Sequence, residues 1–211
     1  MKFCEIIRSM EKYLIGGLIV IFVAFGGFYL LRTVGHVTPS SQSQGIATST
    51  YATTTFSAAY PSDFSINDSY AYDNISPKKL IHGVKFVIPE TMAAGTNLSS
   101  YDTGVSVEQL PRAKNCTGEI FLLADVEPKT WIDNDVKYSV ASTTEAAAGN
   151  LYEEQVYALS GSHPCTAVRY FIHSANIANS ATSTVREFDR SALLAIFGKI
   201  RQSLKLITLQ P

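Results

Sequence analysis

The sequence predicts an α+β domain: a single antiparallel β-sheet packed against helices and closed by a C-terminal helix, preceded by one transmembrane helix. Three observations support this prediction. An uncharged apolar run lies near the N-terminus, strand patterns of period two dominate the middle of the chain, and an amphipathic helix pattern lies near its end. Strands and helices that are set apart in sequence favour an antiparallel sheet covered by helices.

The apolar run covers 19 residues, Tyr13 to Leu31, and contains no charged side chain. At about 1.5 Å rise per residue such a helix spans roughly 28 Å, close to the hydrocarbon thickness of a bilayer. Three basic residues precede the run and only Arg32 follows it closely, so residues 1–12 are expected in the cytoplasm. The sequence thus predicts a single-pass protein of the cell membrane that contacts the lipid bilayer through residues 13–31, with an extracytoplasmic C-terminal domain.

A cleaved signal peptide is the alternative interpretation of this run. The apolar core of a signal peptide usually covers about 7–15 residues and ends at a small-x-small cleavage site. The run here is longer, and it ends in Phe28-Tyr29-Leu30-Leu31 without such a site. A lipoprotein is also not expected, because its lipid-bearing cysteine would follow the apolar run, whereas Cys4 precedes it. These features favour a retained signal-anchor helix.

The chain after the anchor divides into a linker and one domain. Residues 32–53 are rich in Ser, Thr, Gln, Ala and Gly, a composition typical of a flexible linker. Residues 54–211 are long enough to form one domain with its own core. Beyond Arg32 the chain has 13 Lys/Arg and 16 Asp/Glu, a net charge of about −3, without a basic run. Nucleic acid is therefore not an expected partner.

Alternating apolar and polar residues predict the strands of this domain. Four segments with one apolar face precede residue 141, and they are 56–60, 84–88, 105–110 and 136–140. Residues 151–159 and 166–174 flank a short connection that contains Gly and Pro, which favours an antiparallel hairpin. In the second strand of this hairpin, Arg169, Phe171 and His173 share one face.

Two segments carry helix signals. Asp189 is expected to cap a C-terminal helix whose apolar stripe consists of Leu193, Phe197, Ile200 and Leu204. Residues 142–145, Ser-Thr-Thr-Glu, match a capping box before three alanines, with Gly149 as a stop, and predict a short helical turn. Residues 119–126 are ambiguous between helix and strand.

This order of elements resembles the PsbP-like domains, named for an extrinsic protein of photosystem II. The resemblance rests on Phe56–Pro61 with Phe64–Ile66, on the hairpin of Tyr152–Ser174, and on the closing segment Phe188–Leu206. It implies an antiparallel sheet with covering helices, but no cofactor and no activity, because fold alone does not determine function. The chain also resembles anchored proteins of small-genome bacteria that have no assigned activity.

Cys116 and Cys165 are the only cysteines beyond the anchor. In an oxidising compartment an even pair predicts a disulfide, and only one pairing is possible within the domain. Two unpaired buried thiols are an alternative, as is a nucleophilic Cys165 beside His163. A disulfide would remove the thiolate that such a nucleophile needs.

No pattern in the chain predicts a catalytic, metal or cofactor site. The histidines form no pair at metal-ligand spacing, and there is neither a Gly-x-Ser-x-Gly elbow nor a Gly-rich phosphate loop. Three strand residues are candidates for a ligand-binding face: Glu154, Arg169 and His173. Because Glu153 and Glu154 point to opposite faces of a strand, one of the two is expected to pair with Arg169 across the hairpin.

The sequence therefore favours a non-catalytic binding or interaction module of the cell envelope, whose partner is an envelope protein or a small ligand. The alternative is an envelope-associated hydrolase with a site on the sheet face, and the sequence does not decide whether the chain is an enzyme. Exposed aromatic residues on a sheet face would favour binding. A pocket that holds Arg169, His173 and a carboxylate with a strongly shifted pKa would favour catalysis.

Overall fold

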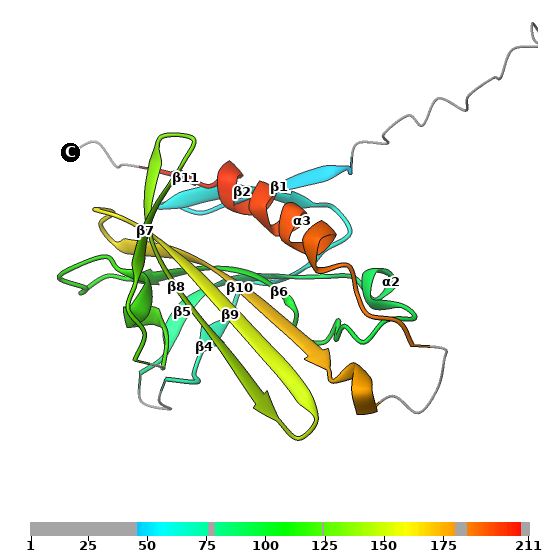
Figure 1. Cartoon of the computed structure of the whole chain (residues 1–211). Coiled ribbons are helices and arrows are strands. Elements are labelled where there is room, and N and C mark those ends of the chain that lie inside the picture. The colour runs from blue at the N-terminus through cyan, green and yellow to red at the C-terminus, as the bar shows by residue number, and fades with distance from the viewer. Residues whose placement is uncertain (1–45, 76–78, 124, 180–184, 208–211) are drawn as a thin grey trace, which may run out of the picture. The chain divides into compact units, whose positions relative to one another are not determined.

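The structure contains a large β-sheet in which each strand runs antiparallel to the strands beside it (Figure 1). The computed structural model describes residues 46–75, 79–123, 125–179 and 185–207. The predicted cytoplasmic segment 1–12 and transmembrane segment 13–31 lie outside the described residues. None of the helices that the structure describes combines the length and apolar character needed to cross a membrane.

The large sheet has eight strands in the order β3-β5-β6-β10-β9-β8-β7, with β4 paired to β5. Its strands are β3 (Ser65–Asn67), β4 (Ala71–Tyr72), β5 (Ile81–Val87), β6 (Gly104–Leu110), β7 (Lys129–Asp133), β8 (Val136–Ala147), β9 (Asn150–Leu159) and β10 (Cys165–Ala175). All of these pairings are antiparallel, so the prediction of a mainly antiparallel sheet is confirmed.

The prediction of a single sheet is wrong, because a second sheet of three strands is present in the described residues. Its order is β1-β2-β11, formed by β1 (Thr48–Ala52), β2 (Phe56–Pro61) and β11 (Lys205–Leu206). The apolar face of β2 points Phe56 and Ala58 into the main core, so β2 packs as a second layer on the large sheet. Strand β1 falls within the segment 32–53 that composition assigns to a linker; residues 32–45 lie outside the described part.

The helices among the described residues are α2 (Glu90–Ala93) and α3 (Arg190–Ser203), with short 3₁₀ turns at η1 (Gly118–Phe121) and η2 (Ile177–Asn179). The predicted C-terminal helix is confirmed as α3. The Asp189 side chain caps it by accepting from the backbone N–H of Ala192 at 2.9 Å. Of the ambiguous segment 119–126, residues 119–121 belong to η1, and its other described residues lie outside the strands.

The apolar faces of the strands and of α3 form the main core. Leu193, Phe197 and Ile200 of α3 are buried against residues such as Val168 and Tyr170 of β10. These two strand residues lie on the same side of the sheet, which we call the helix face. The period-two patterns therefore identified the inward side of the strands correctly, and the predicted hairpin is confirmed as β9–β10.

The predicted helical turn at residues 142–148 is wrong. These residues continue β8, which pairs with β9 from Tyr138 opposite Leu159 to Ala147 opposite Asn150. A two-residue turn follows, in which Ala148 and Gly149 both have positive φ values, 50° and 81°. Long pairing with β9 and a hairpin turn of this type stabilise the extended conformation more than a capping box stabilises one helical turn.

Candidate functional site

The face of the large sheet that points away from α3 carries charged and aromatic side chains, and we call it the polar face. Arg169, Phe171 and His173 alternate with residues of the helix face along β10, and all three lie on the polar face. The register places Glu154 of β9 opposite Phe171 and brings Lys85 of β5 into the cross-strand row of Arg169. Antiparallel pairing thus gathers residues that are distant in sequence.

Arg169 lies at the centre of this group, and its side chain is 0% exposed. Its Nε and Nη2 donate to the two carboxylate oxygens of Glu108 at 2.7 and 2.8 Å, a two-point ion pair. Its Nη1 donates to Glu154, and Nη2 also donates to the backbone oxygen of Phe121 at 2.7 Å. The ring of Tyr72 covers the guanidinium, with its centroid 3.5 Å from Cζ. Charges, a carbonyl and a ring therefore fix the position of Arg169.

The same surroundings shift the pKa values of Arg169 and Tyr72. Burial by itself lowers the pKa of Arg169, but Glu108 and Glu154 outweigh this effect and raise the pKa above its ordinary value. The Tyr72 hydroxyl donates to the carboxylate of Glu154 at 3.0 Å, and burial raises the pKa of Tyr72. Ser106 donates to Glu108 at 2.6 Å. The result is a buried, hydrogen-bonded network of one cation and two carboxylates.

Lys85 is a second buried cation beside this network, and only 8% of the residue is exposed. Its Nζ lies 4.6 Å from the ring centroid of Phe171 and 5.3 Å from that of Tyr70. Burial lowers the pKa of Lys85, while the carboxylates of Asp102 and Glu108 act in the opposite direction. Lys85 and Arg169 are therefore both beneath the surface of the polar face.

His173 lies at the accessible edge of the polar face. Its Nδ1 is 2.7 Å from Oδ1 of Asp102, and the side chains are 18% and 28% exposed, respectively. Ser99 donates to the same carboxylate oxygen at 3.2 Å. The imidazole stacks on Tyr152 with ring centroids 4.5 Å apart. Hydrogen bonding and stacking thus hold His173 in one orientation, because they act on different parts of the ring.

A groove of about 500 Å³ lies beside these residues, within the size range of small-molecule sites. Three aromatic rings and three carboxylates contribute to its lining, and they are Tyr72, Tyr152, Phe171, Asp102, Glu145 and Glu154. The amide of Asn74 and the hydroxyl of Thr143 add neutral polar groups. Within the described part of the chain, no lysine or arginine lines the groove. Apolar surface and hydrogen-bond acceptors are therefore combined in one concave site.

A larger hollow of about 930 Å³ has the opposite charge character. It lies where β6 ends, and Lys79, Arg112 and Lys114 contribute to its lining together with Leu80 and Ile120. Its basic side chains are exposed, and they belong to turns and segment ends rather than to a hydrogen-bonded network. The groove of the polar face is therefore the better defined candidate site.

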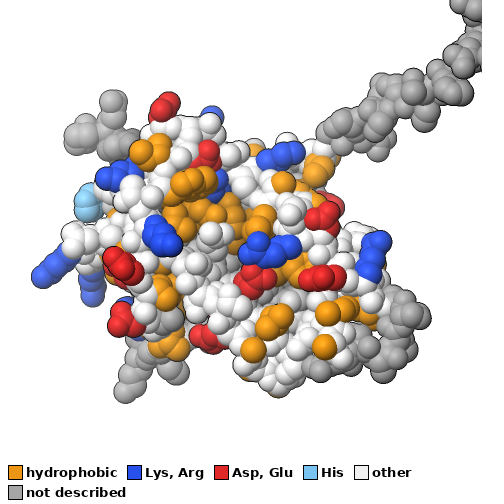
Figure 2. Space-filling model, viewed as in Figure 1, with side chains coloured by type: hydrophobic (Ala, Val, Ile, Leu, Met, Phe, Trp, Pro, Cys, Tyr) orange, Lys and Arg blue, Asp and Glu red, His pale blue; other side chains and the backbone are white. Residues whose placement is uncertain are grey.

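The helix face holds a buried cation of its own, Arg201 of α3, which is 4% exposed. Three rings surround its guanidinium, with centroids 4.5 to 4.9 Å from Cζ: those of Trp131, Tyr138 and Tyr157. Its Nη2 donates to Asp133 at 2.7 Å and its Nε to the Tyr170 hydroxyl at 3.0 Å. Figure 2 shows hydrophobic side chains gathered between β7 and α3 in this region. These contacts fasten the end of α3 to the sheet.

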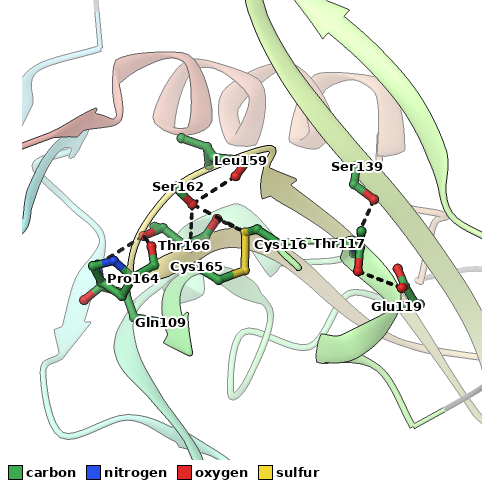
Figure 3. The surroundings of a disulfide bond; sticks show 11 residues. Gln109, Cys116, Thr117, Glu119, Ser139, Leu159, Ser162, Pro164, Cys165 and Thr166 are labelled. Atoms are coloured by element: carbon green, nitrogen blue, oxygen red, sulfur yellow. Dashed lines mark hydrogen bonds between the residues drawn. A yellow bond between two sulfur atoms is a disulfide. The ribbon is translucent and has the colours of Figure 1, made fainter. Parts of the chain in front are cut away.

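The expected disulfide joins Cys116 to Cys165 at the start of β10, with the two Cα atoms 5.1 Å apart (Figure 3). Ser162 lies beside it, with Oγ 3.4 Å from Sγ of Cys116, and accepts from the backbone N–H of Thr166 at 2.9 Å. The bond ties the segment after β6 to the turn end of the β9–β10 hairpin. It leaves no thiol at Cys165 for nucleophilic chemistry.

The structure brings the three predicted ligand-face residues onto one face. Glu154 contacts Arg169 directly, as expected for one of the two adjacent glutamates, whereas His173 pairs with Asp102 instead. The other glutamate, Glu153, lies toward α3 and pairs with Arg190 at 2.7 Å. The predicted opposite orientation of the two glutamates is confirmed.

Several members of the site were not predicted from the sequence. Glu108 could have been found, because the strand pattern of residues 105–110 already placed its side chain on the face of the strand away from Val105 and Val107. Tyr72 and Asp102 had none, since a two-residue strand and a turn residue show no periodicity. Their positions depend on long-range packing, which a single sequence does not display.

Comparison with known proteins gives no family assignment: no family model, curated protein or solved structure matches this chain. The functional proposal therefore rests on the sequence and on the geometry of the described residues. In the residues that the structure describes, no group of three or more His, Cys, Asp or Glu side chains is arranged to hold a metal ion.

Proposed function

We propose that the chain is a membrane-tethered extracytoplasmic domain of the cell envelope that binds a small ligand or protein segment without catalysis, in the groove of the polar face. The groove is the observation that carries this proposal, because it combines rings and carboxylates in one concave surface. The buried network beneath it holds Tyr72 and Glu154 in place through hydrogen bonds.

Binding is favoured over catalysis by the position of Arg169. Its side chain is 0% exposed and its donors already serve Glu108, Glu154 and a backbone oxygen, so a ligand in the groove does not reach it. Arg169 therefore acts as a positioning residue for Glu154. A binding surface needs this kind of preorganised support, since ordering side chains on association costs affinity.

The charges of the groove indicate the chemistry of its ligand. Asp102, Glu145 and Glu154 line it, while the nearby cations Lys85 and Arg169 are buried and engaged. A ligand with an apolar body and a positive or hydroxyl-bearing group complements such a site, and an anion of the same size is repelled.

Three probes of similar size and different charge test this assignment: benzylamine, benzyl alcohol and benzoate. Titrated into the full chain and followed by methyl NMR, benzylamine should perturb Thr143 and Ala147 most and benzoate least. Perturbation by benzoate near Leu80 and Ile120, in the basic hollow, provides an internal control. Equal responses of Thr143 and Ala147 to all three probes would argue against the groove as a charged site.

The membrane tether is part of the proposal. It is supported by the apolar run of residues 13–31 and by the disulfide, which is typical of proteins in oxidising compartments. Reporters fused after Pro211, one active only in the cytoplasm and one only outside it, test the orientation. We expect activity only from the external reporter and retention of the chain in carbonate-washed membranes. Release of soluble protein would contradict a retained anchor.

The PsbP-like fold is also a proposal, supported by the antiparallel strands and by the position of α3 after them. Its test is an experimental structure of the full chain, compared element by element with a PsbP-like domain. Agreement in strand order and in the placement of the last helix would support it, and a different strand order would reject it.

A hydrolase with its site on the same face is the second candidate, and the contact between His173 and Asp102 favours it. A carboxylate that orients one ring nitrogen leaves the other nitrogen of the imidazole to act as a general base. Hydrolysis of p-nitrophenyl acetate that is abolished by His173→Gln, but not by His82→Gln, would support this candidate over simple binding. Equal rates for the two variants would reject it.

A further inference from the structure

The outer edge of β7 is open within the described residues. Among the described strands, β7 ends the large sheet and pairs only with β8, and it lies beside β8 on the left of Figure 1. Trp131 is 40% exposed and Ile132 is 64% exposed. A strand edge with free backbone groups and exposed apolar side chains is a template for pairing with another strand.

The turn that follows β7 determines which of its backbone groups are free. Asn134 and Asp135 form a two-residue turn with φ values of 48° and 64°, the geometry of a tight β-hairpin. In such a hairpin the flanking residues Asp133 and Val136 exchange hydrogen bonds, and the direction alternates along the strand. Thr130 therefore directs its N–H and C=O away from β8, and so does Ile132, two residues further along.

The next strand supports this alternation. Lys137 of β8 lies opposite Ile132, and its backbone oxygen accepts from Ser160 N–H at 3.0 Å, on the side of β8 away from β7. The backbone of Ile132 thus has no hydrogen-bond partner in Lys137 and is free to pair outward.

We propose that β7 pairs antiparallel with β7 of a second copy of this chain, centred on Trp131. In this register Thr130 faces the partner's Ile132, so two outward-directed residues exchange hydrogen bonds on each side of the two-fold axis, about four bonds in all. Trp131 faces the partner's Trp131 at a position without backbone hydrogen bonds, where cross-strand side chains approach most closely.

Charge complementarity selects the same register. Lys129 faces the partner's Asp133, and the two-fold axis repeats this pair. Asp133 uses Oδ2 to accept from Arg201 and Gln202, which leaves Oδ1 for the partner's Lys129. A shift of two residues in either direction loses both the ion pairs and part of the strand overlap, so the centred register is the one in which all five residues of β7 are paired.

Cysteine cross-linking of the full chain tests the register directly. In a Cys4→Ser background, Trp131→Cys places two thiols opposite each other at a distance suited to a disulfide. Mild oxidation should give linked dimers with Trp131→Cys. It should give none with Thr130→Cys, because residue 130 lies opposite the partner's Ile132 and not opposite a second cysteine. Equal linkage by both variants, or linkage by neither, would overturn the proposal.

A second measurement does not alter the central tryptophan. Lys129→Glu places a carboxylate opposite the partner's Asp133, and sedimentation of the full chain should show the dimer dissociation constant raised about tenfold. Lys114→Glu is the matched control, because it makes the same change on a turn that lies beyond β6, far across the sheet order from β7. A monomeric wild-type chain, or equal effects of the two variants, would reject the pairing.

Discussion

The two faces of the large sheet each bury an arginine, but they hold it in different ways. Arg169 on the polar face is held by Glu108 and Glu154, one fully buried and the other nearly so. Arg201 on the helix face is surrounded by aromatic rings, and its carboxylate partner Asp133 is 20% exposed. The first arrangement depends on a balance of buried charges, whereas the second depends on packing.

In our proposal, the surroundings of Arg201 serve stability, whereas the network around Arg169 supports a binding site. The rings of Tyr138 and Tyr157 beside Arg201 belong to the main core, and the contacts of Arg201 fasten α3 to the sheet. Conservative changes of its partly exposed partner Asp133 are therefore tolerable. The network around Arg169 lies beneath the groove, and removing Arg169 leaves the buried carboxylates of Glu108 and Glu154 without their partner. Such a network stabilises little compared with an apolar core, and in our proposal its role is to position the groove residues.

The largest expected effect comes from removing the polar-face arginine. Arg169→Met leaves two buried carboxylates unpaired and should lower the free energy of unfolding by about 3–5 kcal/mol. Arg201→Met leaves only a partly exposed carboxylate and should cost about 1–3 kcal/mol through lost ring contacts. Chemical denaturation followed by circular dichroism compares the two.

The control for this comparison removes a carboxylate together with the arginine. Arg169→Met combined with Glu108→Leu should be less destabilised than Arg169→Met alone, because one of the stranded charges is gone. If Arg169→Met costs no more than Arg201→Met, the contrast between the two faces is wrong.

The disulfide should have the next largest effect. Cys116→Ser or Cys165→Ser opens a link across 49 residues and is expected to destabilise by about 2–4 kcal/mol, because the link restricts the unfolded chain. The double variant should cost no more than the worse single variant, since both remove the same bond. Melting temperatures of the three variants measure this. Reactive thiols at both Cys116 and Cys165 in the unreduced wild-type chain would exclude the bond.

Alkaline pH should weaken both faces together. Burial raises the pKa values of Tyr70 and Tyr72 on the polar face and of Tyr157 and Tyr170 on the helix face. A raised folded-state pKa gives stability that is complete below the unfolded value of about 10 and is lost as pH rises above it. Unfolding free energies measured above pH 10 should therefore fall.

The buried Lys85 should change the pH dependence of stability in the opposite direction. Burial lowers its pKa, so between that lowered value and the unfolded value of about 10.4 the unfolded state binds more protons and stability rises with pH. Lys85→Met should remove this rise, whereas Tyr170→Phe should reduce the loss above pH 10. A stability profile that is unchanged in both variants would show that these groups are not buried as described.

The helix face was largely predictable from the sequence, and the polar face was not. Alternation in strands such as 84–88 and 105–110 identifies the residues that pack under α3, because apolar burial leaves a periodic signal. The polar face combines Arg169 and Glu154 from one hairpin with Glu108 from another strand and Tyr72 from a two-residue strand. Charged residues that pair across a sheet look like solvent-facing residues in the sequence, so only their contacts reveal the network.

The β7–β8 hairpin was also only partly predictable from the sequence. The strand of residues 136–140 was predicted, but its extension to Ala147 and the preceding strand β7 were not. In the first case a local capping signal competed with cross-strand pairing, and the pairing prevailed. In the second, β7 is short and exposed on most of its residues, so it has no apolar face that a periodicity could detect.

Benzylamine binding to groove variants tests the central claim, that the polar face is the binding face, most directly. Glu145→Gln and Tyr152→Ala change the groove lining without touching Arg169, and each should weaken benzylamine affinity by about threefold to tenfold through a lost charge or ring contact. Glu90→Gln, an exposed change on α2 outside the groove, is the matched control and should bind as the wild type does. If both groove variants bind benzylamine as tightly as Glu90→Gln, the polar face is not the binding face.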